Sequence, residues 1–369
     1  MPLAYDILFS AFAFVLGASI GSFLNVCIYR MPLNLSVSDP KRSFCPSCKY
    51  SIPWHHNLPL ISWSVLRGRC ANCGAKISFR YFGVELLTGL LFLGLWRHVW
   101  PEYWVLAIPY WILVSLLVVA TFIDFEHFII PDEITWGGVA AGVVLSFAIP
   151  TLHGADSNLM GGVWALVGAV AGYFTLWAVV ELGKKAFGKK RIKFDKPESF
   201  VWTRQGEDAE LKVGQETEKW SEFFARESDR MLVECERAEI DGERFENVTL
   251  IFHYNRVKAG EKTYELLKTD TISASVREIT IPREAMGFGD VKFIAAIGAF
   301  LGWKAVFFTV LAASTIGAFV GLLTIAIGKR EWSAKIPFGP YLALGAVLWI
   351  FIGPRIIDWY WNFATLSPT

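Results

Sequence analysis

Two aspartates more than 160 residues apart stand at the edges of long apolar segments. Asp124 ends one apolar run, and Asp290 begins another within Gly287-Phe-Gly-Asp290. Burying a charged side chain in lipid costs roughly 3 kcal/mol or more, so carboxylates in such places are typical of functional sites. If the two side chains meet in a protein-lined cleft, they share one proton. One carboxylate then activates a water while its protonated partner polarises a peptide carbonyl. The pattern predicts a hydrolase of peptide bonds.

The residues beside these aspartates suit the same chemistry but also have plainer explanations. Gly287 and Gly289 lack Cβ atoms, which would let an extended substrate backbone approach Asp290. A single carboxylate at the end of a span, however, is more often an interfacial residue or a helix cap than a catalytic group. Asp132, with Thr135 three residues later, resembles such a cap.

Four of the six cysteines form two Cys-x-x-Cys pairs with 21 residues between them. This spacing is typical of a tetrahedral structural zinc site, and a redox pair is the alternative. Thiolate zinc sites persist best in a reducing compartment, which favours the cytoplasm. Cys27 lies in an apolar run and Cys235 stands alone, so we expect both to be packing residues. The four predicted ligands are Cys45, Cys48, Cys70 and Cys73.

The composition indicates a membrane protein that crosses the bilayer several times. Of the 369 residues, 54% are hydrophobic and 19% charged, and the net charge is +1. These values exclude a disordered chain and argue against a nucleic-acid binder that relies on a basic surface. A membrane helix needs about 20 apolar residues. We therefore predict an all-α polytopic membrane protein with about eight transmembrane helices, at about 7–29, 83–100, 103–123, 134–152, 159–183, 290–303, 304–328 and 337–361.

Two polar segments interrupt these helices and define the predicted domains. The first, 30–82, is the zinc-binding loop, and it follows a first transmembrane helix in 1–29. The second, 184–285, holds more than half of all charged residues and contains alternating strand-like stretches with turns at Asp241-Gly242 and Ala259-Gly260. We expect it to be an inserted, β-rich domain between the helices of 83–183 and those of 286–369.

The distribution of basic residues predicts the orientation of the chain. Lysines and arginines concentrate in 30–82, directly after 159–183, and between the last two spans, where Lys329, Arg330 and Lys335 lie. The positive-inside rule then places both chain ends outside and both polar insertions in the cytoplasm.

Many short motifs, in order, resemble those of the type IV prepilin leader peptidases, which are Gly-x-Gly-Asp intramembrane aspartic proteases. The similar segments cover nearly everything outside 184–285. They are Gly21-Ser-Phe-Leu-Asn-Val-Cys-Ile-Tyr-Arg30, Cys45-Pro-Ser-Cys48, Arg80-Tyr-Phe-Gly-Val-Glu85, Asp124 with Ile130-Pro-Asp132, Gly287-Phe-Gly-Asp290-Val-Lys292 and Ile336-Pro-Phe-Gly-Pro340.

The resemblance implies a function and a set of residues. Members of this family remove the basic leader from pilin and pseudopilin precursors at the cytoplasmic face of the bacterial inner membrane. Many then N-methylate the new terminal residue with S-adenosylmethionine, for which Glu85 and the 21–30 segment are candidate binding residues. The implied catalytic pair is Asp124 and Asp290, supported by Gly287, Gly289, Lys292, Pro131 and Asp132.

Two other classes of function stay open at this level. Intramembrane carboxylates also mark proton-coupled transporters, although both aspartates are predicted near one face and the chain has no evident inverted repeat. A zinc-scaffolded assembly protein without catalysis is the second alternative. The 184–285 insertion is either an accessory domain or a device that restricts substrate entry or docks pilus-assembly proteins.

Overall fold

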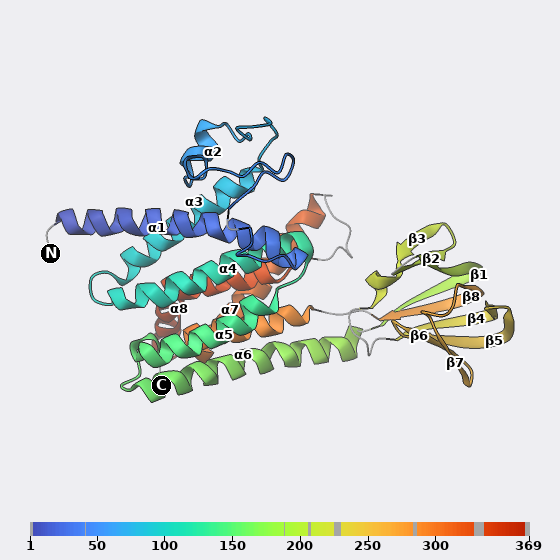
Figure 1. The fold of residues 1–369 in the computed structure, drawn as a ribbon. Coiled ribbons are helices and arrows are strands. Elements are labelled where there is room, and N and C mark those ends of the chain that lie inside the picture. Colours follow the sequence, from blue (N-terminus) through green and yellow to red (C-terminus); the bar gives the residue numbers. More distant parts are fainter. Residues whose placement is uncertain are drawn as a thin grey trace. The chain divides into compact units, whose positions relative to one another are not determined.

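The chain folds into two compact units, drawn in Figure 1. This computed structural model describes residues 3–40, 42–187, 189–205, 208–224, 230–282, 286–327 and 336–365. Residues 1–177 and 287–369 form the helical unit, and residues 178–286 form the second unit. Lys329, Arg330 and Lys335, part of the orientation argument, lie outside the described residues.

Seven long helices build the helical unit. They are α1 (Leu3–Arg30), α3 (Phe79–Val99), α4 (Ala107–His127), α5 (Asp132–Ala148), α6 (Asn158–Phe187), α7 (Phe288–Ala326) and α8 (Gly339–Thr365). Within the described residues, all of these except α5 are long and apolar enough to cross a membrane. A helical polytopic membrane protein, as predicted, is therefore the observed class.

The count of eight spans is not confirmed. It depends on whether α5 spans the membrane and on whether α7 is one span or two. α5 has 17 residues, which is short for a span. α7 is interrupted at Gly302, whose φ of 79° and ψ of 171° are not helical. A Cβ on Gly298 would lie 2.9 Å from a methyl of Val306, so the chain folds back between these residues. The predicted boundary between 290–303 and 304–328 falls at this break.

Contacts at the two ends of the bundle fix how the helices run. At one end, Arg97 of α3 forms an ion pair with Asp6 of α1 at 2.9 Å. At the other end, Arg80 at the start of α3 pairs with Glu126 at the end of α4. The beginning of α1 and the end of α8 lie at the same end of the bundle (Figure 1), which agrees with the predicted placement of both termini on one side.

Small residues let α6 and the first part of α7 approach at backbone distance. A Cβ on Gly168 would lie 2.0 Å from the carbonyl oxygen of Gly298, and one on Gly172 would lie 2.6 Å from that of Ile294. Gly168 and Gly172 form a Gly-x-x-x-Gly pair, which is typical of tight helix packing in membranes. These glycines hold the helix whose first turn carries Asp290.

The second unit is an antiparallel sheet, which confirms the predicted β-rich insertion. The eight strands are β1 (Lys189–Gln205), β2 (Asp208–Val213), β3 (Glu216–Lys219), β4 (Met231–Ile240), β5 (Glu243–Phe252), β6 (Arg256–Ala259), β7 (Lys262–Glu265) and β8 (Thr271–Pro282). Their order is β3-β2-β1-β8-β4-β5-β6-β7. Turns at Asp241-Gly242 and around Gly260 connect the strands as predicted.

A core of its own stabilises this sheet. Phe200, Trp202, Met231 and Phe252 are almost fully buried in it, with Cys235 among them. Burial raises the pKa of the Cys235 thiol to about 12, which suits a core residue and not a metal ligand. The unit therefore has the features of an independent domain.

Candidate functional site

Asp124 lies in the last turn of α4 and is held by the start of α8. Its side chain is buried at 5% exposure, and its Oδ2 accepts a hydrogen bond from the backbone N–H of Gly339 at 2.9 Å. Gly339 is the first residue of α8, where backbone N–H groups lack helical partners and favour an anion. The carboxylate is thus oriented by a helix that lies more than 200 residues away in sequence.

Asp290 lies in the first turn of α7, three residues after the N-cap Gly287. It is 7% exposed, and its backbone N–H donates to the carbonyl of Gly287 at 3.3 Å. Its Oδ1 is buried and has no hydrogen-bond partner among the described residues. Buried carboxylate oxygens are normally paired, so this atom is typical of a functional group.

The two carboxylates are brought together, as the sequence predicts. Asp124 and Asp290 are close enough to interact electrostatically. Ile130, in the loop after α4, fills the space beside them: a Cβ on Gly289 would lie 3.3 Å from its Cβ, and one on Gly339 would lie 3.1 Å from its Cδ1. The missing side chain of Gly289 thus accommodates Ile130, and a role in admitting substrate stays a prediction.

The interpretation of Asp132 as a helix cap is wrong. Pro131 is the N-cap of α5, Asp132 is the first helical residue, and no side chain caps this helix. The Asp132 carboxylate instead accepts from Lys292 Nζ at 2.6 Å. Lys292 lies two residues after Asp290, so this ion pair ties the start of α5 to the start of α7.

The four predicted ligand cysteines form one cluster. All four sulfurs lie within 4.8 Å of one another, with Cys45 and Cys73 Sγ 3.9 Å apart and Cys48 and Cys70 Sγ 4.0 Å apart. Tetrahedral zinc at about 2.3 Å from each sulfur requires S···S separations of about 3.8 Å. The residues present therefore fit a four-thiolate metal site, the only cluster of this kind among the described residues.

Each Cys-x-x-Cys pair lies in the same backbone turn. The N–H of Cys45 donates to the carbonyl of Tyr50 and that of Lys49 to Cys45. In the second pair, Cys70 and Gly74 donate in the same pattern, with acceptors Ala75 and Cys70. Backbone N–H groups directed at sulfur stabilise thiolates.

The pKa values of two thiols reflect this arrangement. The backbone of Tyr50 and the side chain of Asn72 lower the pKa of Cys48 to about 6. The backbone N–H groups of Cys73 and Asn72 likewise lower the pKa of Cys70. The neighbouring thiols, Cys48 first, raise the pKa of Cys73 to about 11, so the changes at Cys48 and Cys70 are the ones that favour the ionised form that binds a metal.

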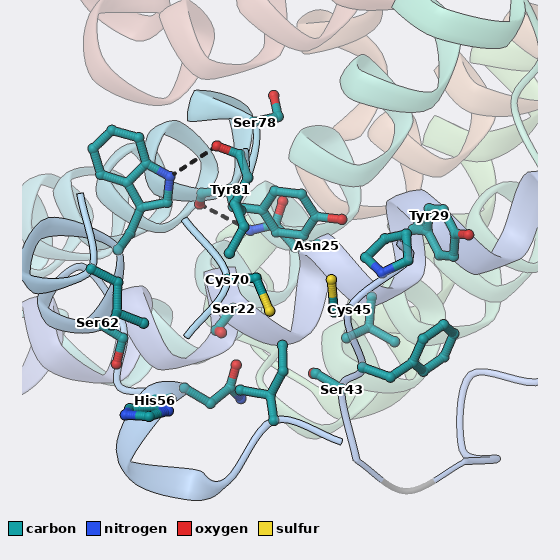
Figure 2. Close-up of a pocket in the computed structure, with 18 of the residues that line it drawn as sticks. Ser22, Asn25, Tyr29, Ser43, Cys45, His56, Ser62, Cys70, Ser78 and Tyr81 are labelled. Atoms are coloured by element: carbon teal, nitrogen blue, oxygen red, sulfur yellow. Dashed lines mark hydrogen bonds between the residues drawn. The ribbon is translucent and has the colours of Figure 1, made fainter. Parts of the chain in front are cut away.

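A cavity of about 490 Å³ lies between α1, the cysteine loop and the start of α3, and we name it the loop pocket. Figure 2 shows Ser22, Asn25 and Tyr29 of α1 in this pocket, with Cys45 and Cys70 in its wall. The predicted binding candidates, Glu85 and the 21–30 segment, therefore line one cavity. Its complete lining also includes Val26, Arg30, Phe44, Tyr50, His56, Trp63, Arg80, Tyr81 and Glu126.

Polar groups converge in the loop pocket. Glu85 is 8% exposed, and its Oε2 accepts from the backbone N–H of Leu60 at 2.7 Å. Asn25 Nδ2 donates to the carbonyls of Gly21 and Tyr81, which fixes the amide orientation. Its Oδ1 is left buried without a partner among the described residues, as is His56 Nδ1. A pocket with such groups is typical of a ligand site.

Sequence reasoning missed the roles of two residues of these sites, Gly339 and Glu126. Gly339 was seen only as part of Ile336-Pro-Phe-Gly-Pro340, yet a glycine and prolines at a helix start indicate free N–H groups. The sequence suggests only an exposed polar residue at Glu126, whereas the structure pairs it with Arg80 in the lining of the loop pocket. No local signal links Arg80 to Glu126, because the contact depends on how α3 and α4 pack.

Comparisons with known proteins match the N-terminal part of the chain and the segments on either side of most of the sheet domain to two families. Residues 15–99 match the family described as the bacterial peptidase A24 N-terminal domain, and residues 111–192 and 267–322 match the type IV leader peptidase family. No solved structure matches significantly.

Three relatives illustrate the similarity. A prepilin leader peptidase/N-methyltransferase of Aeromonas hydrophila is 28% identical over 96% of this chain and 94% of its own length. One of Myxococcus xanthus is 42% identical over 52% of this chain and 54% of its own length. A type 4 prepilin-like proteins leader peptide-processing enzyme of Escherichia coli is 40% identical over 47% of this chain and 69% of its own length. The chain belongs to the type IV leader peptidase family.

Proposed function

We propose that this protein is a membrane-embedded aspartic endopeptidase that removes the basic leader from type IV prepilins or pseudopilins. The observation that carries the proposal is the meeting of Asp124 and Asp290, two buried carboxylates at the ends of different helices. The names of the relatives, with their prepilin substrates, support the same reaction.

The chemistry follows from two carboxylates that share one proton. The ionised carboxylate takes a proton from a water, whose oxygen adds to the scissile carbonyl carbon, while the protonated partner donates a hydrogen bond to the carbonyl oxygen. The C–N bond then breaks, and the leaving nitrogen receives a proton and becomes an amine. The Gly339 N–H holds Asp124 in place. The two residues act as a coupled pair, and neither role is assigned to one of them.

The depth of the pair matches the substrate. A prepilin carries a basic leader before an apolar helix, so its scissile bond lies where lipid meets the cytoplasm. Asp124 lies in the last turn of α4 and Asp290 in the first turn of α7, both at helix ends that would reach that boundary. We place both polar insertions, 30–82 and 184–285, on the cytoplasmic face of a bacterial inner membrane, as the basic residues indicate.

We assign a structural zinc ion to the four cysteines. Four thiolates at these separations would close the coordination sphere and leave no position for a substrate water. The metal would therefore hold the 30–82 loop in shape and take no part in hydrolysis.

The loop pocket favours a second activity, N-methylation of the new terminus. Its volume lies within the usual range for ligand sites, about 300–1,000 Å³. Glu85 and Glu126 would attract a cation, and the rings of Tyr29, Phe44 and Tyr81 can pack on a planar base. Asn25 Oδ1 and His56 Nδ1 offer unpaired polar atoms. These residues fit S-adenosylmethionine, which supplies a methyl group on a positively charged sulfur.

The protein side of that transfer needs a positioned amine. The new terminal nitrogen must lose a proton before its lone pair can form a bond to carbon. Glu85 lies in the pocket with its carboxyl fixed by the backbone N–H of Leu60. We propose that Glu85 orients the amine or the donor.

The sheet domain is the candidate docking site for assembly proteins. Its edge strand β3 is short and presents exposed Glu216, Glu218 and Lys219, which disfavour strand pairing, so an assembly protein would contact this edge through their charges. Removal of 190–282 tests whether the sheet domain binds an assembly protein.

One experiment separates the peptidase from the transporter and the scaffold protein. Purified full-length protein in detergent is mixed with a prepilin, and leader release is followed by mass spectrometry. We expect release by the wild type and none by Asp124→Asn or Asp290→Asn. Glu133→Gln, an exposed carboxylate beside the site, is the matched control and should cleave normally. Cleavage by both aspartate variants would show that the catalytic pair is wrong, and no cleavage by the wild type would favour the alternatives.

A further inference from the structure

The last turn of α4 carries two carboxylates that face different sites. Asp124 contacts α8 through Gly339, whereas Glu126 pairs with Arg80 and lines the loop pocket. Two residues apart in a helix, their side chains are separated by about 200° around the axis. A single helix end, about 10–12 Å wide with its side chains, therefore separates the cleavage pair from the loop pocket.

The Arg80–Glu126 ion pair leaves its carboxylate available to another cation. Nη1 of Arg80 is within 2.5 Å of both Glu126 oxygens, while 43% of the Glu126 side chain is exposed. The Arg80 side chain is 17% exposed, so the solvent-facing part of the Glu126 carboxylate is where a second cation can bind and compete with the guanidinium. Arg30, the other arginine in the lining, is occupied by the carbonyls of Ser36, Val37 and Pro40.

Hydrolysis creates such a cation at this place. Before cleavage the nitrogen of the scissile bond is a neutral amide, and afterwards it is an α-ammonium group with a pKa of about 8. Hydrolysis removes the basic leader and leaves a positive charge at the new terminus itself, within one helix width of Glu126. Once the leader has left, the Glu126 carboxylate in the pocket lining can bind this terminal charge, which the intact peptide bond lacks.

We propose that Glu126 recognises the new terminal ammonium of the cleaved substrate and directs it into the loop pocket. The ammonium takes the place of Arg80 on the Glu126 carboxylate and reaches the cavity in which Glu85 lies deeper. Glu126 is then a specificity-determining residue that admits product of the first reaction to the second site. The inference rests on the proposed N-methylation, and its test is separable from that activity.

The first measurement needs no variant and no methyl donor. Full-length protein in detergent is titrated with a synthetic pilin segment that starts at the mature terminus, and with the same segment acetylated at its α-nitrogen. Acetylation removes the charge and with it the charge-assisted hydrogen bond to Glu126. We expect the free amine to bind about tenfold or more tightly than the acetylated segment. Equal affinities would overturn the proposal.

The second measurement assigns the preference to Glu126. In Glu126→Gln, the preference for the free amine should disappear. The matched control is Asp6→Asn, which breaks a different ion pair between helices, that with Arg97, and should keep the preference. If Glu126→Gln still binds the free amine more tightly than the acetylated segment, the proposal is contradicted.

A charge exchange separates recognition from a structural role. Arg80→Glu combined with Glu126→Arg restores an ion pair between the same positions but removes the carboxylate from α4. If the pair only joined α3 to α4, the exchange would restore binding of the free amine, and this result would overturn the proposal. We expect binding to remain weak. Labelled methyl transfer by the wild type, measured in parallel, tests the proposed second activity independently of this preference.

Discussion

The backbone N–H of Gly339 donates to Oδ2 of Asp124 at 2.9 Å, although 215 positions separate the two residues. The contact joins the end of α4 to the beginning of α8, while Asp290 enters from the beginning of α7. Three helix termini thus meet at one site. An N–H donor at a helix start favours a carboxylate and fixes its direction.

Replacement of Gly339 by alanine should disturb Asp124 directly. A Cβ at this position would lie 2.7 Å from Asp124 Oδ2 and 3.1 Å from Ile130 Cδ1, so the carboxylate must shift. Because misplacement of about 1 Å can lower a rate about 100-fold, we expect a fall in kcat for leader cleavage of at least tenfold. Gly137→Ala is the control, since nothing lies within 4 Å of its added Cβ. Equal activities of the two variants would contradict this role.

The Lys292–Asp132 ion pair should position Asp290 without touching the substrate. Lys292 Nζ lies 2.6 Å from Asp132 Oδ1, and the lysine side chain is 19% exposed. Lys292→Met removes this tie, and we expect a lower kcat for cleavage with little change in KM. Lys292→Arg should recover much of the rate because it keeps the charge.

Lys304→Met provides the control for loss of a lysine elsewhere on α7. Its ammonium lies near the ring of Trp303, away from the start of the helix. Steady-state kinetics on one prepilin decide the matter. A change in KM alone for Lys292→Met would assign the residue to substrate binding and not to positioning.

Metal removal should affect the loop pocket before the aspartate pair. Cys45 and Cys70 form part of the pocket wall, whereas neither contacts Asp124 or Asp290. We expect chelation or Cys45→Ser to reduce donor binding and methyl transfer more than leader cleavage. Metal analysis should find about one zinc per chain in the wild type and in the control Cys235→Ser. A zinc-free protein with both activities intact would rule out a structural role for the metal.

Removal of the sheet domain should leave cleavage intact. Lys189 in β1 is the pairing partner of Pro282 in β8, so the two ends of the domain lie about 5 Å apart. Replacing 190–282 with a few glycines can therefore close the chain without strain on α6 and α7. We expect the shortened protein to release the leader from a prepilin at a rate similar to that of the full chain.

Loss of cleavage in the shortened protein is interpreted by testing each native precursor separately. If one precursor is no longer processed while others are, the domain selects substrates. If cleavage persists but pilus assembly fails in cells, the domain docks an assembly protein. Circular dichroism of the shortened protein checks that the helices are retained.

Local patterns in the sequence were sufficient for much of this molecule. Length and hydropathy reveal most of the spans, and the two Cys-x-x-Cys pairs predict a metal cluster because each pair lies in one short turn. The break near Gly302 was also visible as a boundary between apolar runs.

The remaining features depend on contacts between distant segments. The hydrogen bond from Gly339 to Asp124 and the pair between Lys292 and Asp132 join residues 160 or more positions apart. Asp132 reads as a cap because its local context is that of a helix start, and only packing of α5 against α7 reveals its partner. The central pairing of β1 with β8 is likewise non-local.

The close approach of Gly168 to Gly298 limits which parts of the bundle can move. Their backbones are in contact with no side chain between them, so α6 and the first half of α7 cannot slide past each other without a collision. Asp290 therefore lies on a helix that is held rigidly against α6. A movement that admits a substrate would therefore displace α4 or α8 and stretch the hydrogen bond from Gly339 to Asp124.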